Sequence, residues 1–129
     1  MNIKYTVNDS NLNPEEFISL ANSIWPRPYD AEQTRLALSK TINITARDND
    51  ILVGCVRILS DGVYFGTITE LLISPSYQKR KIGTKLMELV QENTPTQLYF
   101  GAQPSAISFY EKIGLEKGFS SFTIKKGRK

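Results

Sequence analysis

Three consecutive basic residues, Lys79, Arg80 and Lys81, directly precede a segment with the apolar spacing of an amphipathic helix. The apolar residues on that helix face are Ile82, Leu86, Leu89 and Val90. A helix N-terminus carries unpaired N–H groups and a partial positive charge, so cations are disfavoured there and an anion is stabilised. The spacing therefore indicates an anion-binding site. The alternative is that the three basic side chains are simply solvated.

The chain contains no histidine and a single cysteine, Cys55. Catalysis by Ser–His–Asp or Cys–His groups is therefore excluded, and no metal site is expected. Cys55 lies in the apolar run 51–56, which predicts a buried strand residue rather than a nucleophile. A lone cysteine fits a reducing compartment, and neither a signal peptide nor a membrane-spanning segment is recognisable, so a cytoplasmic location is expected.

The composition is that of an ordinary globular protein, with 40% hydrophobic and 22% charged residues, and one domain over residues 1–129 is predicted. The net charge of +3 includes four basic residues at the C-terminus, so the rest of the chain carries −1. These four residues are Lys125, Lys126, Arg128 and Lys129. No basic helix interleaves with aromatic residues, so nucleic acid is not expected as a partner. A membrane is not expected either.

The elements that must position the basic stretch follow from the hydrophobic pattern and the turn residues. Strands are predicted at residues 3–7, 42–46, 51–59, 63–73, 98–100 and 119–124. Helices are predicted at residues 14–22, at 31–39, from the basic stretch to 93, and from 104 to 113. Asp30 and Gly114 are expected to cap the second and fourth helices. This order indicates an α+β fold, with a mixed, mostly antiparallel sheet of about six strands flanked by four helices.

Two motifs resemble those of the GNAT superfamily of acyl-CoA-dependent N-acetyltransferases. Residues 70–78, Glu-Leu-Leu-Ile-Ser-Pro-Ser-Tyr-Gln, look like the strand that enters that family's pyrophosphate loop, and Gln78-x-x-Lys81-x-Gly83 is similar to its [Q/R]-x-x-G-x-[G/A]. Residues 106–115, Ala-Ile-Ser-Phe-Tyr-Glu-Lys-Ile-Gly-Leu, are similar to its A-x-x-F-Y-x-K-x-G-F. Lys81 departs from the pattern, because it replaces the first glycine. We expect it to adopt ordinary helical angles.

The resemblance implies that acetyl-CoA binds along the fourth strand and at the following helix N-terminus. The residues implied in cofactor binding are Leu72, Ile73, Gln78, Lys79, Arg80, Lys81, Ile82, Gly83 and Thr84. The backbone of Leu72 and Ile73 would pair with the pantetheine arm like an added strand, and the N–H of Ile73 is the expected oxyanion donor. The backbone after the basic stretch would hold the pyrophosphate.

The resemblance also assigns catalytic roles. Tyr110 is the expected general acid, because its ordinary pKa near 10 lies above the roughly 8.5 of a thiol. Glu70 is the expected base, acting through a water. The alternatives are an aromatic packed on the sheet for Tyr110 and a carboxylate paired with a nearby basic residue for Glu70. Trp25, Arg27 and Tyr29 are candidates for shaping the acceptor pocket, and the alternative is a proline-rich loop pinned by aromatics.

The expected function is thus transfer of an acetyl group from acetyl-CoA to a small-molecule or peptide amine. A non-catalytic acyl-CoA-binding or sensing module on the same fold is the alternative, because a fold does not guarantee activity. The sequence lacks G-x-x-x-x-G-K-[S/T] and G-x-G-x-x-G, which excludes a phosphate-binding NTPase of that kind. A homodimer is common in the resembling superfamily.

Overall fold

The computed structural model describes residues 2–127 and contains a four-stranded antiparallel sheet at its centre. The strands are β1 (Ile3–Thr6), β2 (Ile42–Asp48), β3 (Ile51–Ser60) and β4 (Gly66–Ile73), and they lie in this order across the sheet. Tight turns after Asp48 and Ser60 connect the last three strands, so sequence neighbours pair directly. Arg128 and Lys129, which belong to the basic C-terminus, lie outside the described residues.

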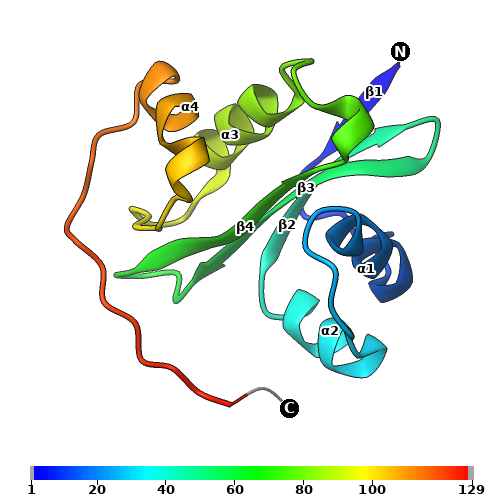
Figure 1. Cartoon of the computed structure of the whole chain (residues 1–129), viewed down its shortest axis with the longest axis horizontal. Coiled ribbons are helices and arrows are strands. Elements are labelled where there is room, and N and C mark those ends of the chain that lie inside the picture. Colours follow the sequence, from blue (N-terminus) through cyan, green and yellow to red (C-terminus); the bar gives the residue numbers. More distant parts are fainter. Residues whose placement is uncertain (1, 128–129) are drawn as a thin grey trace.

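The helices cover both faces of this sheet (Figure 1). They are α1 (Pro14–Asn22), α2 (Ala31–Leu38), α3 (Ile82–Asn93) and α4 (Ile107–Lys112), with short 3₁₀ turns at Pro75–Tyr77 and Pro104–Ala106. Figure 1 shows α1 and α2 on one face and α3 and α4 on the other. The predicted α+β architecture, with a mostly antiparallel sheet and four helices, is confirmed.

Local side-chain hydrogen bonds explain where the first two helices begin. Asn13 accepts a hydrogen bond from the N–H of Glu16 (2.9 Å), and the Glu16 carboxylate accepts one from the N–H of Asn13 (3.1 Å). This capping box satisfies two donors that the helix leaves unpaired. Asp30 caps α2 in the predicted way by accepting from the N–H of Gln33 (2.8 Å). Gly114 follows α4 with a φ of +93°, as expected of a glycine after a helix.

The hydrophobic core is divided by the sheet into two layers. Ile82, Leu86, Met87 and Val90 of α3 pack on one face, against side chains of β2, β3 and β4. On the other face, α1 and α2 bury a second cluster. That cluster consists of Phe17, Leu20, Ala21, Leu38, Leu52, Cys55 and Leu72. Leu72 of β4 therefore points toward α1, while Ile73 contacts the layer under α3.

The structure corrects the predicted number of strands from about six to four. Of residues 98–100, only Leu98 makes a bridge, in parallel orientation, to Gly66. Residues 119–124 form no strand, and their apolar side chains are exposed. Alternating apolar residues form a strand only where a neighbouring edge completes the hydrogen bonds, and within residues 2–127 neither segment has such a partner along its length. The fourth strand also starts later than predicted, at Gly66, because residues 63–65 belong to the turn.

Candidate active site

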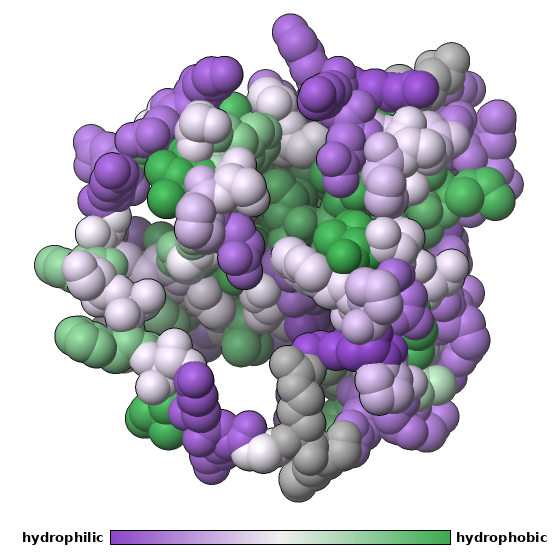
Figure 2. Space-filling model, in the orientation of Figure 1, coloured by the Kyte–Doolittle hydropathy of each residue, from purple (hydrophilic) through white to green (hydrophobic). Residues whose placement is uncertain are grey.

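The outer edge of β4 is open over residues 68–73. Gly66 bridges Leu98, and Gly66 O accepts a hydrogen bond from the N–H of Tyr99 (3.0 Å). A Cβ at position 66 would lie 2.6 Å from the Leu98 side chain, so glycine permits this close approach. Beyond that point no other described residue pairs with the outer edge of β4. In the orientation of Figure 1, Figure 2 shows hydrophobic surface recessed in the middle of the face, between more hydrophilic rims.

The pairing register identifies the backbone groups that face this open edge. The N–H of Ser74 donates to the carbonyl of Val53 on β3 (2.8 Å). Because alternate residues of an antiparallel pair face the partner strand, the backbone groups of Leu72 face β3, and those of Leu71 and Ile73 face outward. The N–H of Ile73 therefore faces the open edge of β4. Leu71, which the sequence reasoning did not include, is an equivalent outward donor, and the alternation along the strand was the signal for it.

The basic stretch after β4 forms an unusual turn into α3. Lys79 and Lys81 have φ angles of 63° and 64°, and Lys81 is the N-cap of α3 with ψ of 15°. The expectation of ordinary helical angles for Lys81 is therefore wrong. The position adopts the left-handed conformation that glycine tolerates best, and a lysine there is strained. Residues held in such rare backbone conformations concentrate at functional sites.

The N-terminus of α3 has no side-chain cap. Among residues 2–127 no side-chain capping hydrogen bond is formed at Lys81, and no acidic residue lies in the first helical turn. The N–H groups of Ile82, Gly83 and Thr84 precede the first intrahelical donor, since Lys85 N–H is the one that donates to Lys81 O (3.1 Å). Helix N–H groups and the helix dipole both favour an anion at this place. The anion site indicated by the sequence thus has the backbone geometry that it requires.

Side chains around the turn hold it against the sheet. The Gln78 amide donates to the carbonyl of Ile73 (3.3 Å), so it is engaged at the outward edge of β4. The Tyr77 hydroxyl donates to Asp48 (2.7 Å), and the Arg80 guanidinium lies 5.3 Å from the centre of the Tyr77 ring. The Tyr77 hydrogen bond holds the pKa of Asp48 below its ordinary value. The start of the turn is therefore fixed by contacts to strand residues.

Tyr110 lies on α4, and its ring faces the chain that follows the Gly66–Leu98 bridge. Its ring makes edge-to-face contacts with Phe100 and Phe109, with ring centres 5.1 Å apart in each case. Phe109 in turn approaches Gly83 in the first turn of α3. Burial raises the pKa of Tyr110 above its ordinary value of 10.0, and no described residue hydrogen-bonds to its hydroxyl. The hydroxyl therefore keeps its proton at neutral pH.

Glu70 is held by Arg57 on the adjacent strand. Arg57 Nε donates to Glu70 Oε1, and the second guanidinium contact, to Glu70 Oε2, is 3.5 Å long. Arg57 Nε also contacts the Thr69 hydroxyl (3.1 Å), and the guanidinium lies 5.5 Å from the centre of the Phe17 ring. Both charged side chains are mostly buried, with 13% and 19% exposed. The pairing with a basic residue, which was the alternative for Glu70, is thus present, and it holds the carboxylate in a fixed place.

Trp25, Arg27 and Tyr29 come together in the loop between α1 and α2. The Tyr29 hydroxyl donates to the carbonyl of Trp25 (3.1 Å), and the Arg27 guanidinium lies 4.7 Å from the centre of the Tyr29 ring. Tyr29 packs against the core layer under α1, while the Trp25 side chain is 48% exposed. The loop is pinned by its own aromatic contacts, and the exposed Trp25 ring remains available for contact with another molecule.

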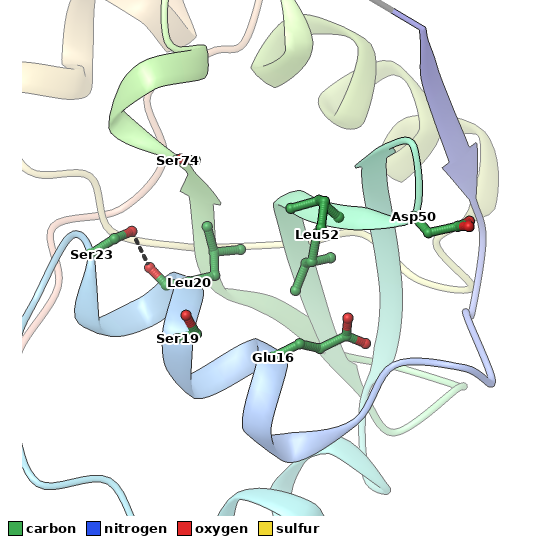
Figure 3. A pocket seen from close by; sticks show the side chains of 8 residues that line it. Glu16, Ser19, Leu20, Ser23, Asp50, Leu52 and Ser74 are labelled. Atoms are coloured by element: carbon green, nitrogen blue, oxygen red, sulfur yellow. Dashed lines mark hydrogen bonds between the residues drawn. The ribbon is translucent and has the colours of Figure 1, made fainter.

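A cavity of about 350 Å³ lies between α1 and the beginning of β3 (Figure 3). Its lining residues are Glu16, Ser19, Leu20, Ser23, Asp50, Ile51, Leu52 and Ser74. Ser74 directly follows Ile73, so the cavity reaches the carboxyl end of β4. None of the loop residues expected to shape the acceptor pocket lines it, and no local sequence pattern indicates it, because its residues come from three separate segments of the chain.

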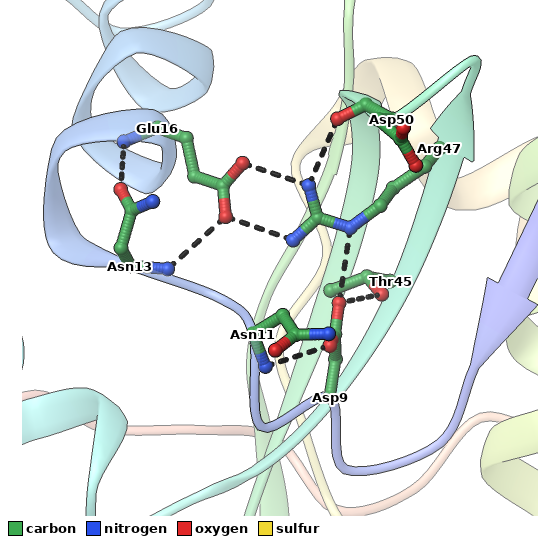
Figure 4. A network of polar contacts seen from close by, with 7 residues as sticks. All are labelled: Asp9, Asn11, Asn13, Glu16, Thr45, Arg47 and Asp50. Carbon is green, nitrogen blue, oxygen red and sulfur yellow. Dashed lines mark hydrogen bonds and ion pairs between the residues drawn. The ribbon is translucent and has the colours of Figure 1, made fainter.

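An ion-pair network next to this cavity fixes α1 to the sheet (Figure 4). Both guanidinium NH₂ groups of Arg47 donate to the Glu16 carboxylate (2.7 and 2.8 Å), and Arg47 Nε donates to Asp9 (3.1 Å). Burial pushes the pKa of Asp9 upward, but hydrogen bonds from Thr45, Asn11 and Arg47 outweigh it and lower that pKa. Hydrogen bonds from Arg47 chiefly lower the pKa of Glu16. The partners lie far apart in the chain, so no local sequence pattern indicates this network.

Other chemistry is absent from the described residues. Cys55 is fully buried, and burial raises the pKa of its thiol to about 12, as expected of a core residue and not of a nucleophile. Within residues 2–127 no group of acidic, cysteine or histidine side chains is arranged to hold a metal ion. Across the same range, every helix is too short or too polar to cross a lipid bilayer.

Comparison with known proteins finds a protein family that this chain resembles. The family model described as an acetyltransferase (GNAT) domain matches residues 9–127. An uncharacterized N-acetyltransferase, ycf52, from Porphyra purpurea is 33% identical over 123 residues, which cover 88% of this chain and 70% of that protein. The match thus includes the open edge of β4, the basic turn and α4.

Solved structures show the same fold. A GNAT-family acetyltransferase from Streptococcus pneumoniae is 24% identical with a TM-score of 0.74, over 98% of this chain and all of that one. An aminoglycoside 6′-N-acetyltransferase complexed with coenzyme A is 22% identical with a TM-score of 0.73, over 88% of this chain and 84% of that one.

Proposed function

Because this chain belongs to the GNAT family of acetyltransferases, and is therefore an acyltransferase, we propose that it moves the acetyl group of acetyl-CoA to a primary amine. One observation carries the proposal. The strand β4, with its outward-facing backbone groups, leads through a short turn directly into the uncapped N-terminus of α3. An acyl-CoA has two matching parts in series, an extended amide-containing arm and a pyrophosphate. The first pairs with a strand edge, and the second binds at a helix N-terminus.

The residues present fit this group. Leu71 and Ile73 offer outward N–H groups, and the turn with Lys79 and Lys81 at positive φ directs backbone N–H groups toward an anion. Acetyl-CoA, when bound, supplies an acetyl group activated as a thioester. The N–H of Ile73 stabilises the negative charge that develops on the thioester oxygen during amine attack. Loss of such a donor costs on the order of 10²–10³ in rate.

Tyr110 gives a proton to the departing sulfur. A thiol has an ordinary pKa of roughly 8.5, below the roughly 10 of a tyrosine hydroxyl, so the proton moves to the sulfur only if the two groups are in direct contact while the carbon–sulfur bond breaks. Burial keeps Tyr110 protonated at neutral pH by raising its pKa above 10.0. Its edge-to-face contacts with Phe100 and Phe109 hold the ring in one orientation.

Glu70 accepts the amine proton through a water. An alkyl ammonium has a pKa near 10.4, so a carboxylate removes its proton only with the help of a relay. Arg57 fixes the Glu70 carboxylate but occupies part of its hydrogen-bonding capacity. We expect Glu70→Gln to lower kcat/KM most at acidic pH, where the free amine is scarcest. Glu92→Gln on the exposed side of α3 is the control, and an equal loss for Glu70→Gln at every pH would contradict this role.

The loop that carries Trp25, Arg27 and Tyr29 shapes the acceptor side of the site, and the acceptor is a small-molecule or peptide amine. The exposed Trp25 ring supports this assignment, since it offers an apolar surface on which an acceptor could pack. Replacing Trp25 with alanine is expected to raise KM for the amine and leave binding of acetyl-CoA unchanged. An unchanged KM for the amine would remove the loop from the acceptor site.

Calorimetry tests the binding half of the proposal. Acetyl-CoA is expected to bind with a Kd below about 1 mM, corresponding to about 4 kcal/mol. S-acetylpantetheine lacks the pyrophosphate, so it is expected to bind at least about tenfold more weakly if the α3 N-terminus holds that group. Absence of binding would contradict the proposal, and equal affinity of both compounds would remove the α3 N-terminus from the site. Binding without acetyl transfer would favour the alternative, a non-catalytic acyl-CoA-binding module.

A further inference from the structure

The ion pair of Arg57 with Glu70 lies on the face of the sheet that α1 covers. Arg57 is paired with Glu70 across β3 and β4, two positions along from the pair of Cys55 with Leu72. Side chains two residues apart on a strand point to the same face, and Cys55 and Leu72 pack in the layer under α1. The ion pair therefore lies on the face opposite α3, on the strand that has the open outer edge.

The contacts of Arg57 use only one edge of its guanidinium group. A guanidinium holds five N–H donors in one plane, and Nε and Nη2 each point one of them to the same side. Nε contacts Glu70 Oε1 and the Thr69 hydroxyl, and the contact of Nη2 with Glu70 Oε2 is 3.5 Å long. Within residues 2–127, Nη1 forms no hydrogen bond. The edge formed by Nη1 and the second N–H of Nη2 is therefore unused by the described chain.

Arg47 shows how a structural arginine of the same exposure is satisfied in this protein (Figure 4). The side chains of Arg47 and Arg57 are both 13% exposed. Arg47 Nε donates to Asp9, both Nη groups donate to Glu16, and Nη1 also donates to the carbonyl of Asp50. All three nitrogens of Arg47 thus have protein partners, whereas one nitrogen of Arg57 has none among the described residues.

The unused donors of Arg57 are accessible to another molecule. Within residues 2–127, no side-chain nitrogen or oxygen is both buried and without a hydrogen-bond partner, so Nη1 must contact solvent. The guanidinium lies over the Phe17 ring, 5.5 Å from its centre, and this ring is itself buried. A cation that is largely removed from water is stabilised by an anion that hydrogen-bonds to it. The free edge of Arg57 therefore favours an anionic ligand group.

The shape and charge of the free edge select a carboxylate. Its two parallel N–H groups match the two oxygens of a carboxylate, which gives a directional, bidentate contact. Glu70 already neutralises the charge of Arg57 from the other edge. A singly charged carboxylate is therefore repelled less by Glu70 than a doubly charged phosphate group is.

The position of Glu70 limits how far this carboxylate lies from the reacting amine. Glu70, the proposed base, is held on one edge of the guanidinium whose other edge is free. An acceptor that gives its amine proton to a water on Glu70 reaches Arg57 only with a group a few bonds from its amino nitrogen. An amino acid has a carboxylate there, whereas a peptide N-terminus has an uncharged amide in that place.

We propose that Arg57 is a specificity-determining residue that binds the carboxylate of the acceptor, and that the acceptor is a small amine of the amino-acid type. The inference rests on the proposed function, because it names the class of amine that receives the acetyl group. It gives a role to the donors of Arg57 that the fold leaves without a partner.

Amino acids compared with their own amides test the proposal. The amide keeps the amine and the side chain of the amino acid but has no negative charge. Thiol release from saturating acetyl-CoA is measured with the wild-type protein, for several L-amino acids of different side-chain size and for their amides. The value of kcat/KM is expressed per free amine, because an amide changes the pKa of the amine. We expect the best amino acid to exceed its amide at least about tenfold.

The variant Arg57→Lys assigns this preference to the guanidinium. It keeps a positive charge next to Glu70 but removes the edge with two parallel donors, so the ratio of acid to amide is expected to fall at least about tenfold. Both substrates are compared on one protein sample, so a loss of folded protein cancels in the ratio. Arg47→Lys removes an equally buried guanidinium and is expected to leave the ratio unchanged.

Three results would overturn the proposal. Amides that equal or exceed their amino acids show that no carboxylate is recognised. A preference for the acid that persists in Arg57→Lys assigns the carboxylate to another residue. Amines without a carboxylate that react faster than every amino acid remove this acceptor class, but they leave the proposed acetyl transfer intact. Absence of thiol release with every amine contradicts the proposed function and this inference together.

Discussion

At the scale of single residues, Lys81 combines a strained backbone with a charge at the place where the family pattern has glycine. Its φ of 64° costs roughly 1–2 kcal/mol for a residue with a side chain. The ammonium group stands at the uncapped start of α3, where a bound phosphate would need a positive partner. The strain is therefore accounted for if the charge contributes to binding.

Replacing Lys81 with glycine separates these two effects. We expect Lys81→Gly to raise the free energy of unfolding by up to about 1 kcal/mol, because the left-handed conformation no longer meets a Cβ. The same change should weaken binding of acetyl-CoA and make it less sensitive to salt, because a charge is lost. Urea unfolding and calorimetry at two salt concentrations measure both quantities. Lys81→Arg keeps the charge and the strain, and the account is contradicted if it behaves like the glycine variant.

Tyr110 provides a second prediction at this scale. Tyr110→Phe is expected to lower kcat by about 10²-fold or more, with little change in KM for acetyl-CoA, because only the donated proton is lost. Since burial raises the pKa of Tyr110, wild-type activity should decline only above pH 10, where the hydroxyl loses its proton, and this decline should disappear in the variant. Tyr5→Phe is a matched control, because burial also raises the pKa of Tyr5. An unchanged rate for Tyr110→Phe would remove its assigned role.

At the scale of elements, the position of α1 depends on Arg47, which joins the helix to β2. The guanidinium pairs with Glu16 on α1 and with Asp9 in the preceding loop, and both carboxyl groups have lowered pKa values. A carboxyl group whose pKa is lower in the folded state stabilises the fold at neutral pH. That contribution is lost as the pH falls through the folded-state pKa values.

Arg47→Met is therefore expected to destabilise the protein by about 3 kcal/mol at neutral pH, because it leaves the buried Asp9 carboxylate without its partner. The difference from wild type should shrink as the pH is lowered and the two carboxyl groups become protonated. Urea unfolding over a pH series measures it. The control, Arg35→Met, breaks an exposed pair with Glu32 and should cost less than about 1 kcal/mol. A difference for Arg47→Met that stays constant with pH would contradict the network's role.

Elements governed by local chemistry were predictable from the sequence. The capping side chain of Asp30, the proline at the start of α1 and Gly114 after α4 each act within a few residues, and the corresponding helix ends were confirmed. The strands predicted at 98–100 and 119–124 were wrong, because pairing depends on distant edges that a local pattern does not describe. The left-handed turn at Lys81 was missed for a related reason, since a lysine carries no local signal for positive φ.

The same division holds within the candidate site. The sequence motifs placed Ile73, the basic stretch and Tyr110 in one family pattern, and the structure brings the strand, the turn and α4 into one region. Two ionic contacts join residues from separate strands and helices. They are the pair of Glu70 with Arg57 and the ion-pair network around Arg47. The residue types in the sequence do not by themselves indicate which of these side chains pair.

At the scale of the whole molecule, the sheet separates two helical layers, and the candidate site lies at the open outer edge of β4. Binding of acetyl-CoA and the proposed transfer of its acetyl group use the outward N–H groups of β4, the N-terminus of α3 and the hydroxyl of Tyr110, while Glu70 on the same strand takes the amine proton. The central claim is therefore that the edge binds acetyl-CoA and delivers its acetyl group to an amine.

Release of free thiol from acetyl-CoA, measured across a panel of small-molecule amines, peptide amines and an aminoglycoside, tests this claim most directly. The account predicts that at least one amine accelerates thiol release well above the amine-free rate, and that the acceleration is lost in Tyr110→Phe. Binding of acetyl-CoA with no amine-dependent release from any member of the panel would contradict it.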